Sequence, residues 1–297
     1  MVEVTDATTE DLTFFSGPGL RLAARIYLPG EKSDRKTGIV FCHGFGGVKD
    51  GTPVGLSNLL AQHGYTVLTF DYRGFGGSEG RANHLVPAEQ VEDAVNAIEY
   101  LAQRPGIDPR KIGIYGTSFG GGIAILAANR SERLRAAFIT VPVMSGDQWL
   151  RSVNRFHEYV AMKARAFQAI ANKTVSGHME MVDRFDIVPP DPHSRARHVT
   201  KQPFTLETFY HLTTHEPIAE AHKVDIPVGI IGIRGDILVP VEQTTWLYDR
   251  LPGPKQIHLF DEGNHHSVYG ELLPGVASRA IAWFDRHLND GRQSDSA

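Results

Sequence analysis

The order of apolar and polar positions predicts alternating strands and helices. Two apolar runs on either side of Gly17-Pro18-Gly19 predict a β-hairpin near the start of the chain. Strands that are apolar throughout and alternate with helices form a parallel sheet that is buried on both faces. The sequence therefore predicts a doubly wound α/β fold, with a mostly parallel sheet and an N-terminal antiparallel hairpin. Further strands are expected over residues 38–42, 65–70, 111–115, 136–141, 228–233 and 256–260, and helices over 54–62, 87–104 and 276–288.

One long segment interrupts this alternation. Between residues 145 and 224, apolar side chains such as Trp149 recur at three- or four-residue spacing, without a strong strand pattern. We therefore expect a helical cap over residues 145–224, inserted between two strands of the core. The core would comprise residues 1–144 and 225–297.

Composition and charge restrict the class of protein. Glycine provides 30 of the 297 residues, above its usual share of about 7 %, so many backbone positions favour positive φ or close approach. The net charge is −4 without a long basic run, which disfavours nucleic acid as a partner. The sole cysteine, Cys42, lies in an apolar run and is expected to be a buried structural thiol. Because no secretory or membrane-spanning pattern occurs, we expect a soluble cytoplasmic protein that does not associate with membranes.

The segment Gly116-Thr117-Ser118-Phe119-Gly120 joins an expected strand to an expected apolar helix. A nucleophile on so tight a turn requires glycine two residues before and after it, because side chains there would collide with the neighbouring strand and helix. The start of the helix would direct free N–H groups toward charge that develops on a substrate oxygen. We therefore identify Ser118 as the candidate nucleophile.

A serine nucleophile requires a base, and the base requires an orienting acid. In a sheet of this kind the acid follows a later strand and the histidine follows the last one. Asp236 comes directly after the expected strand at 228–233 and is the candidate acid, with Asp147 as the alternative. Two adjacent histidines, His265 and His266, follow the last strand and compete as the base, since neighbouring side chains diverge.

A third loop, Phe41-Cys42-His43-Gly44-Phe45-Gly46-Gly47, also follows an expected strand. Acyl transfer requires two backbone N–H donors near the developing oxyanion. One comes from the residue after the nucleophile and the other from a loop after an earlier strand. The candidates are the N–H groups of Phe119 and Phe45. We expect His43 to brace this loop rather than to act as a base.

Taken in order, these motifs resemble the α/β-hydrolase superfamily over residues 12–144 and 225–288. The chain looks most like bacterial serine esterases and acyl hydrolases of the dienelactone-hydrolase and peptidase-like branch, with a helical cap. The resemblance implies that Asp71, Arg73 and Ser78 belong to a structural turn and have no catalytic role. It rests on His43-Gly44-Phe45-Gly46-Gly47, Phe70-Asp71-Tyr72-Arg73-Gly74-Phe75-Gly76-Gly77-Ser78, Gly116-Thr117-Ser118-Phe119-Gly120, Gly235-Asp236-Ile237-Leu238-Val239-Pro240 and Gly263-Asn264-His265.

The resemblance also bears on the two histidines. In related hydrolases the catalytic histidine keeps a set spacing to a following aromatic residue and to the lysine that opens the final strand. The spacings to Tyr269 and to Lys255 both point to His265 as the catalytic histidine. The spacing from Gly263 selects His266 instead, so His265 is the preferred base and His266 the alternative.

The sequence thus predicts a serine hydrolase that cleaves a small, partly apolar acyl ester through an acyl-enzyme on Ser118. The cap aromatics Trp149, Phe156 and Phe209 are the expected substrate contacts. We expect no organic cofactor and no metal, because no group of ligands has metal spacing. The same residues allow acyl transfer or cleavage of amide or carbon–carbon bonds. A ligand-binding module without catalysis is the alternative from another class, and the oligomeric state is left open.

Overall fold

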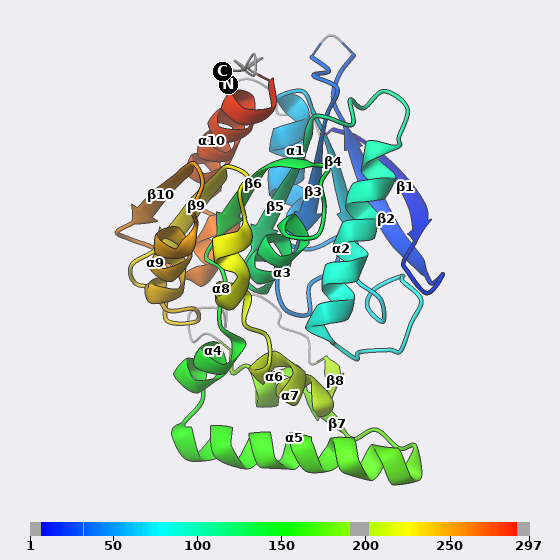
Figure 1. The fold of residues 1–297 in the computed structure, drawn as a ribbon, viewed down its shortest axis with the longest axis vertical. Coiled ribbons are helices and arrows are strands. Elements are labelled where there is room, and N and C mark those ends of the chain that lie inside the picture. The colour runs from blue at the N-terminus through cyan, green and yellow to red at the C-terminus, as the bar shows by residue number, and fades with distance from the viewer. Residues whose placement is uncertain (1–6, 32, 191–201, 290–297) are drawn as a thin grey trace.

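An eight-stranded sheet forms the centre of the computed structural model, which describes residues 7–31, 33–190 and 202–289 (Figure 1). Its strands are β1 (Thr8–Phe15), β2 (Arg21–Leu28), β3 (Thr37–Cys42), β4 (Tyr65–Phe70), β5 (Ile112–Thr117), β6 (Leu134–Thr140), β9 (Val228–Ile233) and β10 (Lys255–Phe260). The strand order is β1-β2-β4-β3-β5-β6-β9-β10. β2 pairs antiparallel with β1 and β4, and all other neighbours are parallel. The predicted sheet with its N-terminal hairpin is confirmed.

Helices cover both faces of this sheet (Figure 1). One face carries α1 (Pro53–Gln62) and α10 (Leu273–Phe284), which a π-helical turn, η4 (Asp285–Asn289), continues. The other face carries α2 (Pro87–Ala102), α3 (Phe119–Ala128) and α9 (Val241–Arg250). The sheet is thus the middle layer of three.

Alternate residues of β3 supply two separate apolar cores. Ile39 and Phe41 join the cluster that includes side chains of α1 and α10, whereas Val40 and Cys42 join the cluster that includes side chains of α2 and α3. A strand placed between two cores is apolar at every position, which explains its continuous apolar run. Burial raises the pKa of the Cys42 thiol to about 12, so this cysteine is the unreactive structural thiol that we expected.

The segment between β6 and β9 lies at one end of the sheet (Figure 1). It contains α4 (Gly146–Val153), α5 (Phe156–Ser176), α6 (Arg184–Ile187), α7 (Glu207–Thr213), α8 (Pro217–Glu220) and the 3-10 helix η2 (Ala221–Lys223). It also contains two paired antiparallel strands, β7 (Met181–Asp183) and β8 (Pro203–Thr205). The sequence predicts no strand here, because a strand of three residues is too short for an alternating pattern to be recognised. We refer to the elements from α4 to α7 as the cap.

The carboxyl ends of four parallel strands bring the predicted site residues together. The loops after β3, β5, β9 and β10 carry Phe45, Ser118, Asp236 and His265 respectively. β3 is a neighbour of β5, and β9 is a neighbour of β10. Open α/β sheets form their sites outside these strand ends. No helix in the described ranges has the length and apolar composition that crossing a membrane requires.

Candidate active site

Ser118 lies on a sharp turn between β5 and α3. Its backbone has a φ of 55° and a ψ of −127°, a strained conformation for a residue with a side chain. A Cβ atom on Gly116 would lie 2.6 Å from the Cβ atom of Ala124, and one on Gly120 would overlap backbone carbonyl oxygens of the loop after β3. Glycine is therefore required on both sides of the serine, for the steric reason that the sequence analysis used.

His265 and Asp236 continue from Ser118 in one series of hydrogen bonds. Nε2 of His265 lies 2.9 Å from Oγ of Ser118, and Nδ1 of His265 lies 2.7 Å from Oδ2 of Asp236. Oδ1 of Asp236 accepts the backbone N–H groups of Leu238 and Val239, each at 2.9 Å. All three side chains in the series are buried. Because the backbone holds one oxygen of the carboxylate, the other is fixed in place for the imidazole.

The alternative base and the alternative acid have different surroundings. His266 lines a pocket together with Ser118 and His265, but its ring lies 5.5 Å from that of His265 between centroids, and His265 is the residue that contacts the serine. Asp147 lies on α4 and forms ion pairs with Lys163 at 2.9 Å and with Arg151 at 2.8 Å. The structure therefore brings the preferred histidine and the preferred aspartate to the serine.

The loop after β3 passes close to Ser118. A Cβ atom on Gly44 would lie 3.1 Å from the Cβ atom of Ser118, so the main chain approaches the serine closely here. Phe45 follows in the chain, and its ring stacks on Phe204 of the cap with 4.8 Å between centroids. Phe119 is the first residue of α3, where a helix leaves its N–H groups without partners in the helix. Both residues predicted to supply N–H donors thus lie in segments that adjoin Ser118.

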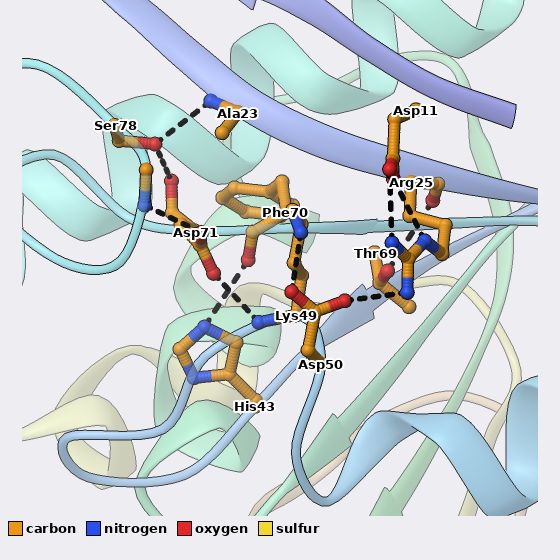
Figure 2. Close-up of polar contacts among 11 residues, drawn as sticks. Asp11, Ala23, Arg25, His43, Lys49, Asp50, Thr69, Phe70, Asp71 and Ser78 are labelled. Carbon is orange, nitrogen blue, oxygen red and sulfur yellow. Dashed lines mark hydrogen bonds and ion pairs between the residues drawn. The ribbon is translucent and has the colours of Figure 1, made fainter.

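A buried network holds the loop after β3 in place (Figure 2). Nε2 of His43 lies 3.1 Å from the backbone oxygen of Phe70, and burial lowers the pKa of this imidazole. The carboxylate of Asp71 accepts the N–H of Lys49 at 2.6 Å and the N–H of Gly77 at 2.9 Å. His43 therefore braces the loop, and Asp71 ties this loop to the turn after β4.

Ser78 and Arg73 stabilise the turn after β4. Oγ of Ser78 donates to the backbone oxygen of Asp71 at 2.5 Å and accepts the N–H of Ala23 at 2.9 Å (Figure 2). Arg73 donates to the buried carboxylate of Asp93 at 2.6 Å and 2.9 Å. These contacts make the segment the structural turn that the resemblance implied.

A pocket of about 180 Å³ opens beside Ser118, and both the core and the cap contribute to its walls. Trp149 of α4, one of the expected substrate contacts, lines it. Phe156 and Phe209 are not among its described lining residues, which corrects the expectation for both. Phe156 is 69 % exposed on α5, and Phe209 is buried inside the cap against Tyr159. The sequence shows that these side chains are apolar, but it does not show which neighbour each one faces.

One charged residue of this pocket was not predicted from the sequence. Arg184, the first residue of α6, lines it from the cap side. Its guanidinium carbon lies 5.8 Å from the ring centroid of Phe45. A single arginine outside any motif carries no signal in the sequence, and only the folded cap brings it to the serine.

A second polar group was also missed, at the junction of the cap and the core. One ligand atom each from His84, Glu207 and His211 lies within 4.8 Å of the others, which is the spacing of a potential metal site. However, Lys173 donates to the carboxylate of Glu207 at 2.6 Å, so a cation already balances this charge. Burial also lowers the pKa of His84 to about 4. We interpret the group as a polar contact that joins α5 and α7 of the cap to the loop before α2.

Comparison with known proteins adds a family to this geometry. Residues 33–272 match the family model described as serine aminopeptidase, S33. The quorum-quenching protein AidA of Acinetobacter baumannii is 35 % identical over 291 residues, which cover 92 % of this chain and 93 % of that protein. The thiohydrolase aneE of Aspergillus aculeatus is 26 % identical over 300 residues, which cover 93 % of this chain and 92 % of that protein.

Solved structures share the fold. The α/β hydrolase GrgF from a Penicillium species matches with a TM-score of 0.82 and 19 % identity, and the match covers 95 % of this chain and 99 % of that one. The DcsB structure matches with a TM-score of 0.83 and 18 % identity, over 95 % and 99 % of the two chains. At these identities the likeness shows the fold alone, whereas the family model covers most of the sequence. The chain therefore belongs to the serine aminopeptidase S33 family and has the fold of the α/β hydrolases.

Proposed function

We propose that the protein is a serine hydrolase that cleaves an ester bond through an acyl-enzyme on Ser118. The observation that carries this proposal is the unbroken series of hydrogen bonds from Asp236 through His265 to Ser118. A serine hydroxyl is a poor nucleophile until a base accepts its proton, and the base must be oriented by a third group. Membership of a hydrolase family supports the same reading.

In this mechanism Oγ of Ser118 attacks the acyl carbonyl while Nε2 of His265 accepts the hydroxyl proton. The bond from the acyl carbon to the alcohol oxygen then breaks, and His265 gives its proton to that oxygen. Water repeats the sequence on the acyl-enzyme and releases a carboxylic acid and free serine. Asp236 accepts a hydrogen bond from Nδ1–H, which leaves Nε2 without a proton and ready to act as the base.

The N–H groups of Phe119 and Phe45 are the proposed donors to the oxyanion of the tetrahedral intermediate. Two features support this role, namely the place of Phe119 at the start of α3 and the close approach of the Gly44 main chain to Ser118. Removal of one such donor from a site of this kind costs about 2.7–4 kcal/mol of transition-state stabilisation. No step requires a metal or an organic cofactor.

The proposed substrate is a small, partly apolar acyl ester. Trp149, Val188 and Leu238 give the pocket apolar walls, and its volume of about 180 Å³ suits a short acyl group. The choice of an ester bond is itself part of the proposal, because relatives similar in sequence are named for other reactions. They include a thiohydrolase and several polyketide transferases.

Acyl transfer is the second candidate function. The polyketide transferase af380 of Aspergillus fumigatus is 27 % identical over 297 residues, which favours an acceptor other than water for the same acyl-enzyme. Product analysis with and without an added alcohol separates the two functions. A transferase yields a new ester at the expense of the free acid, whereas a hydrolase yields the free acid in both reactions.

Labelling with a fluorophosphonate tests the proposed nucleophile. We expect the wild type to be labelled and Ser118→Ala to remain unlabelled, and equal labelling would overturn the assignment. Hydrolysis of a series of p-nitrophenyl esters then compares His265→Ala with His266→Ala. We expect much the larger loss of kcat with His265→Ala, and the reverse order would move the base to His266.

A further inference from the structure

Arg184 is a charged residue of the pocket that the proposed mechanism does not use. It begins α6 directly after the capping residue Asp183, and it lines the pocket together with Ser118 and His265. The guanidinium lies over the ring of Phe45, whose N–H is one of the two proposed oxyanion donors. A positive charge therefore faces the space in which the substrate would bind.

Among the described residues, the hydrogen-bond partners of this guanidinium are neutral and lie at long distance. Nη2 donates to the backbone oxygen of Phe45 at 3.4 Å, and Nη1 donates to Oε1 of Gln202 at 3.5 Å. Hydrogen bonds of this length are at the weak limit, and a guanidinium has five N–H groups to donate. The ion pairs among the described residues do not include Arg184. By contrast, the buried Arg73 contacts the carboxylate of Asp93 at 2.6 Å.

Burial makes this arrangement costly in the absence of a ligand. The side chain is half-buried, and its loss of water lowers the pKa of Arg184, which the nearby charge of Asp183 offsets only in part. A desolvated cation is stabilised when an anion with matching geometry is placed against it. In a pocket beside a nucleophile, the group that can supply this anion is the substrate.

We propose that Arg184 binds a free carboxylate on the acyl part of the substrate, so that the preferred substrates are monoesters of short dicarboxylic acids. This inference rests on the proposed function, whose site it extends. A carboxylate matches the planar fork of a guanidinium in two parallel hydrogen bonds. Trp149 and Leu238, which line the same pocket, offer apolar contacts for the methylene groups between the carboxylate and the reacting carbonyl.

The kinetic test compares monomethyl glutarate and monomethyl adipate with the matching dimethyl esters, which have the same chain length but no charge. For the wild type we expect kcat/KM to favour the monoesters by about 10–100-fold, the range of a hydrogen-bonded charged pair. Arg184→Met should abolish this ratio, and Arg184→Lys should restore part of it because the charge remains. A wild-type ratio near one, or a ratio that Arg184→Met leaves unchanged, overturns the inference.

Arg155→Met is the matched control for this test. Arg155 precedes α5 on the exposed surface of the cap, so its substitution removes the same charge from the protein at a distance from the pocket. We expect it to leave the ratio of monoester to diester unchanged. A ratio that falls as much with Arg155→Met as with Arg184→Met would attribute the preference to overall charge and overturn the local contact.

A binding measurement separates this inference from the proposed function. Titration calorimetry with monomethyl adipate on Ser118→Ala requires no turnover, and adding Arg184→Met should weaken binding at least 10-fold. Binding that depends on Arg184, together with a wild type that hydrolyses no ester, would overturn the esterase function and support the carboxylate contact. Hydrolysis of neutral esters, together with monoester binding that does not depend on Arg184, would support the esterase function and overturn the carboxylate contact.

Discussion

The carboxylate of Asp236 contacts the imidazole of His265 across 2.7 Å, although the two residues are 29 positions apart in the sequence. Their loops follow β9 and β10, which are adjacent and parallel, so the sheet itself sets the distance between them. Two backbone N–H groups hold the second oxygen of the carboxylate. The pair is therefore oriented before any substrate binds, which the proposed roles of base and orienting acid require.

Asp236→Asn tests this orientation with little change of shape. The amide oxygen would keep the contacts to the backbone and turn its NH₂ group toward Nδ1, which favours the tautomer with the proton on Nε2. We expect kcat for a p-nitrophenyl ester to fall about 10³–10⁴-fold. Asp147→Asn is the matched control, because Asp147 pairs with Lys163 and Arg151 of the cap, and we expect it to stay within about twofold of the wild type. Equal losses in both variants would contradict the assignment of Asp236.

Gly120→Ala tests the steric basis of the nucleophile turn. Alanine is the better helix former by about 1 kcal/mol, so propensity alone would stabilise α3. The new Cβ atom would overlap backbone oxygens of the loop after β3, and a backbone cannot move aside as a flexible side chain can. We therefore expect a net loss of about 1–3 kcal/mol in the free energy of unfolding, measured in urea, together with a loss of activity.

Gly235→Ala provides the same chemical change without the overlap. Its Cβ atom would come no closer than 3.7 Å to the backbone oxygen of Gly263, which is an ordinary contact. We expect its free energy of unfolding to stay within about 0.5 kcal/mol of the wild type. If Gly120→Ala proved as stable as Gly235→Ala, the requirement for glycine after the serine would have to be abandoned.

The parts of the site that the sequence could predict are those that the sheet topology dictates. Ser118 and Asp236 follow strands that are buried at every position, and His265 follows the edge strand β10. All three strands are parallel, so their carboxyl ends lie at one edge of the sheet. No comparable rule predicts where the side chains of the cap lie. Phe156 and Phe209 are both apolar residues of cap helices, yet one faces solvent and the other faces the interior of the cap. Arg184 reaches the pocket only through tertiary contacts, which no local pattern records.

His215→Phe tests how buried histidines affect stability in acid. His215 packs on the ring of Phe119 behind the nucleophile turn, and burial lowers its pKa to about 3. The unfolded chain binds a proton here near pH 6.5, whereas the folded protein does so only near pH 3. This residue therefore lowers the free energy of unfolding as the pH falls between these values, by up to about 1.4 kcal/mol per pH unit.

Replacing His215 by phenylalanine removes one of these protons. We expect the dependence of the free energy of unfolding on pH, measured in urea between pH 6 and pH 4.5, to become shallower by about 1 kcal/mol per pH unit. The difference in stability from the wild type should be constant between pH 8 and pH 9, where the histidine is neutral in both states. An unchanged slope in acid would mean that His215 accepts a proton in the folded protein.

The ion pair between Lys173 and Glu207 should contribute far more to stability than the exposed pairs of the cap. The Glu207 side chain is 1 % exposed, and Lys173 on α5 supplies its cation at 2.6 Å. Lys173→Met would leave a buried carboxylate without this charge, which costs about 3–5 kcal/mol. Arg165→Met breaks the pair with Glu180, whose side chains are 52 % and 41 % exposed, and should cost about 0–1 kcal/mol. The double variant Lys173→Met with Glu207→Gln removes both charges and should recover part of the loss. Urea denaturation measures all three variants, and equal losses for Lys173→Met and Arg165→Met would mean that water reaches Glu207.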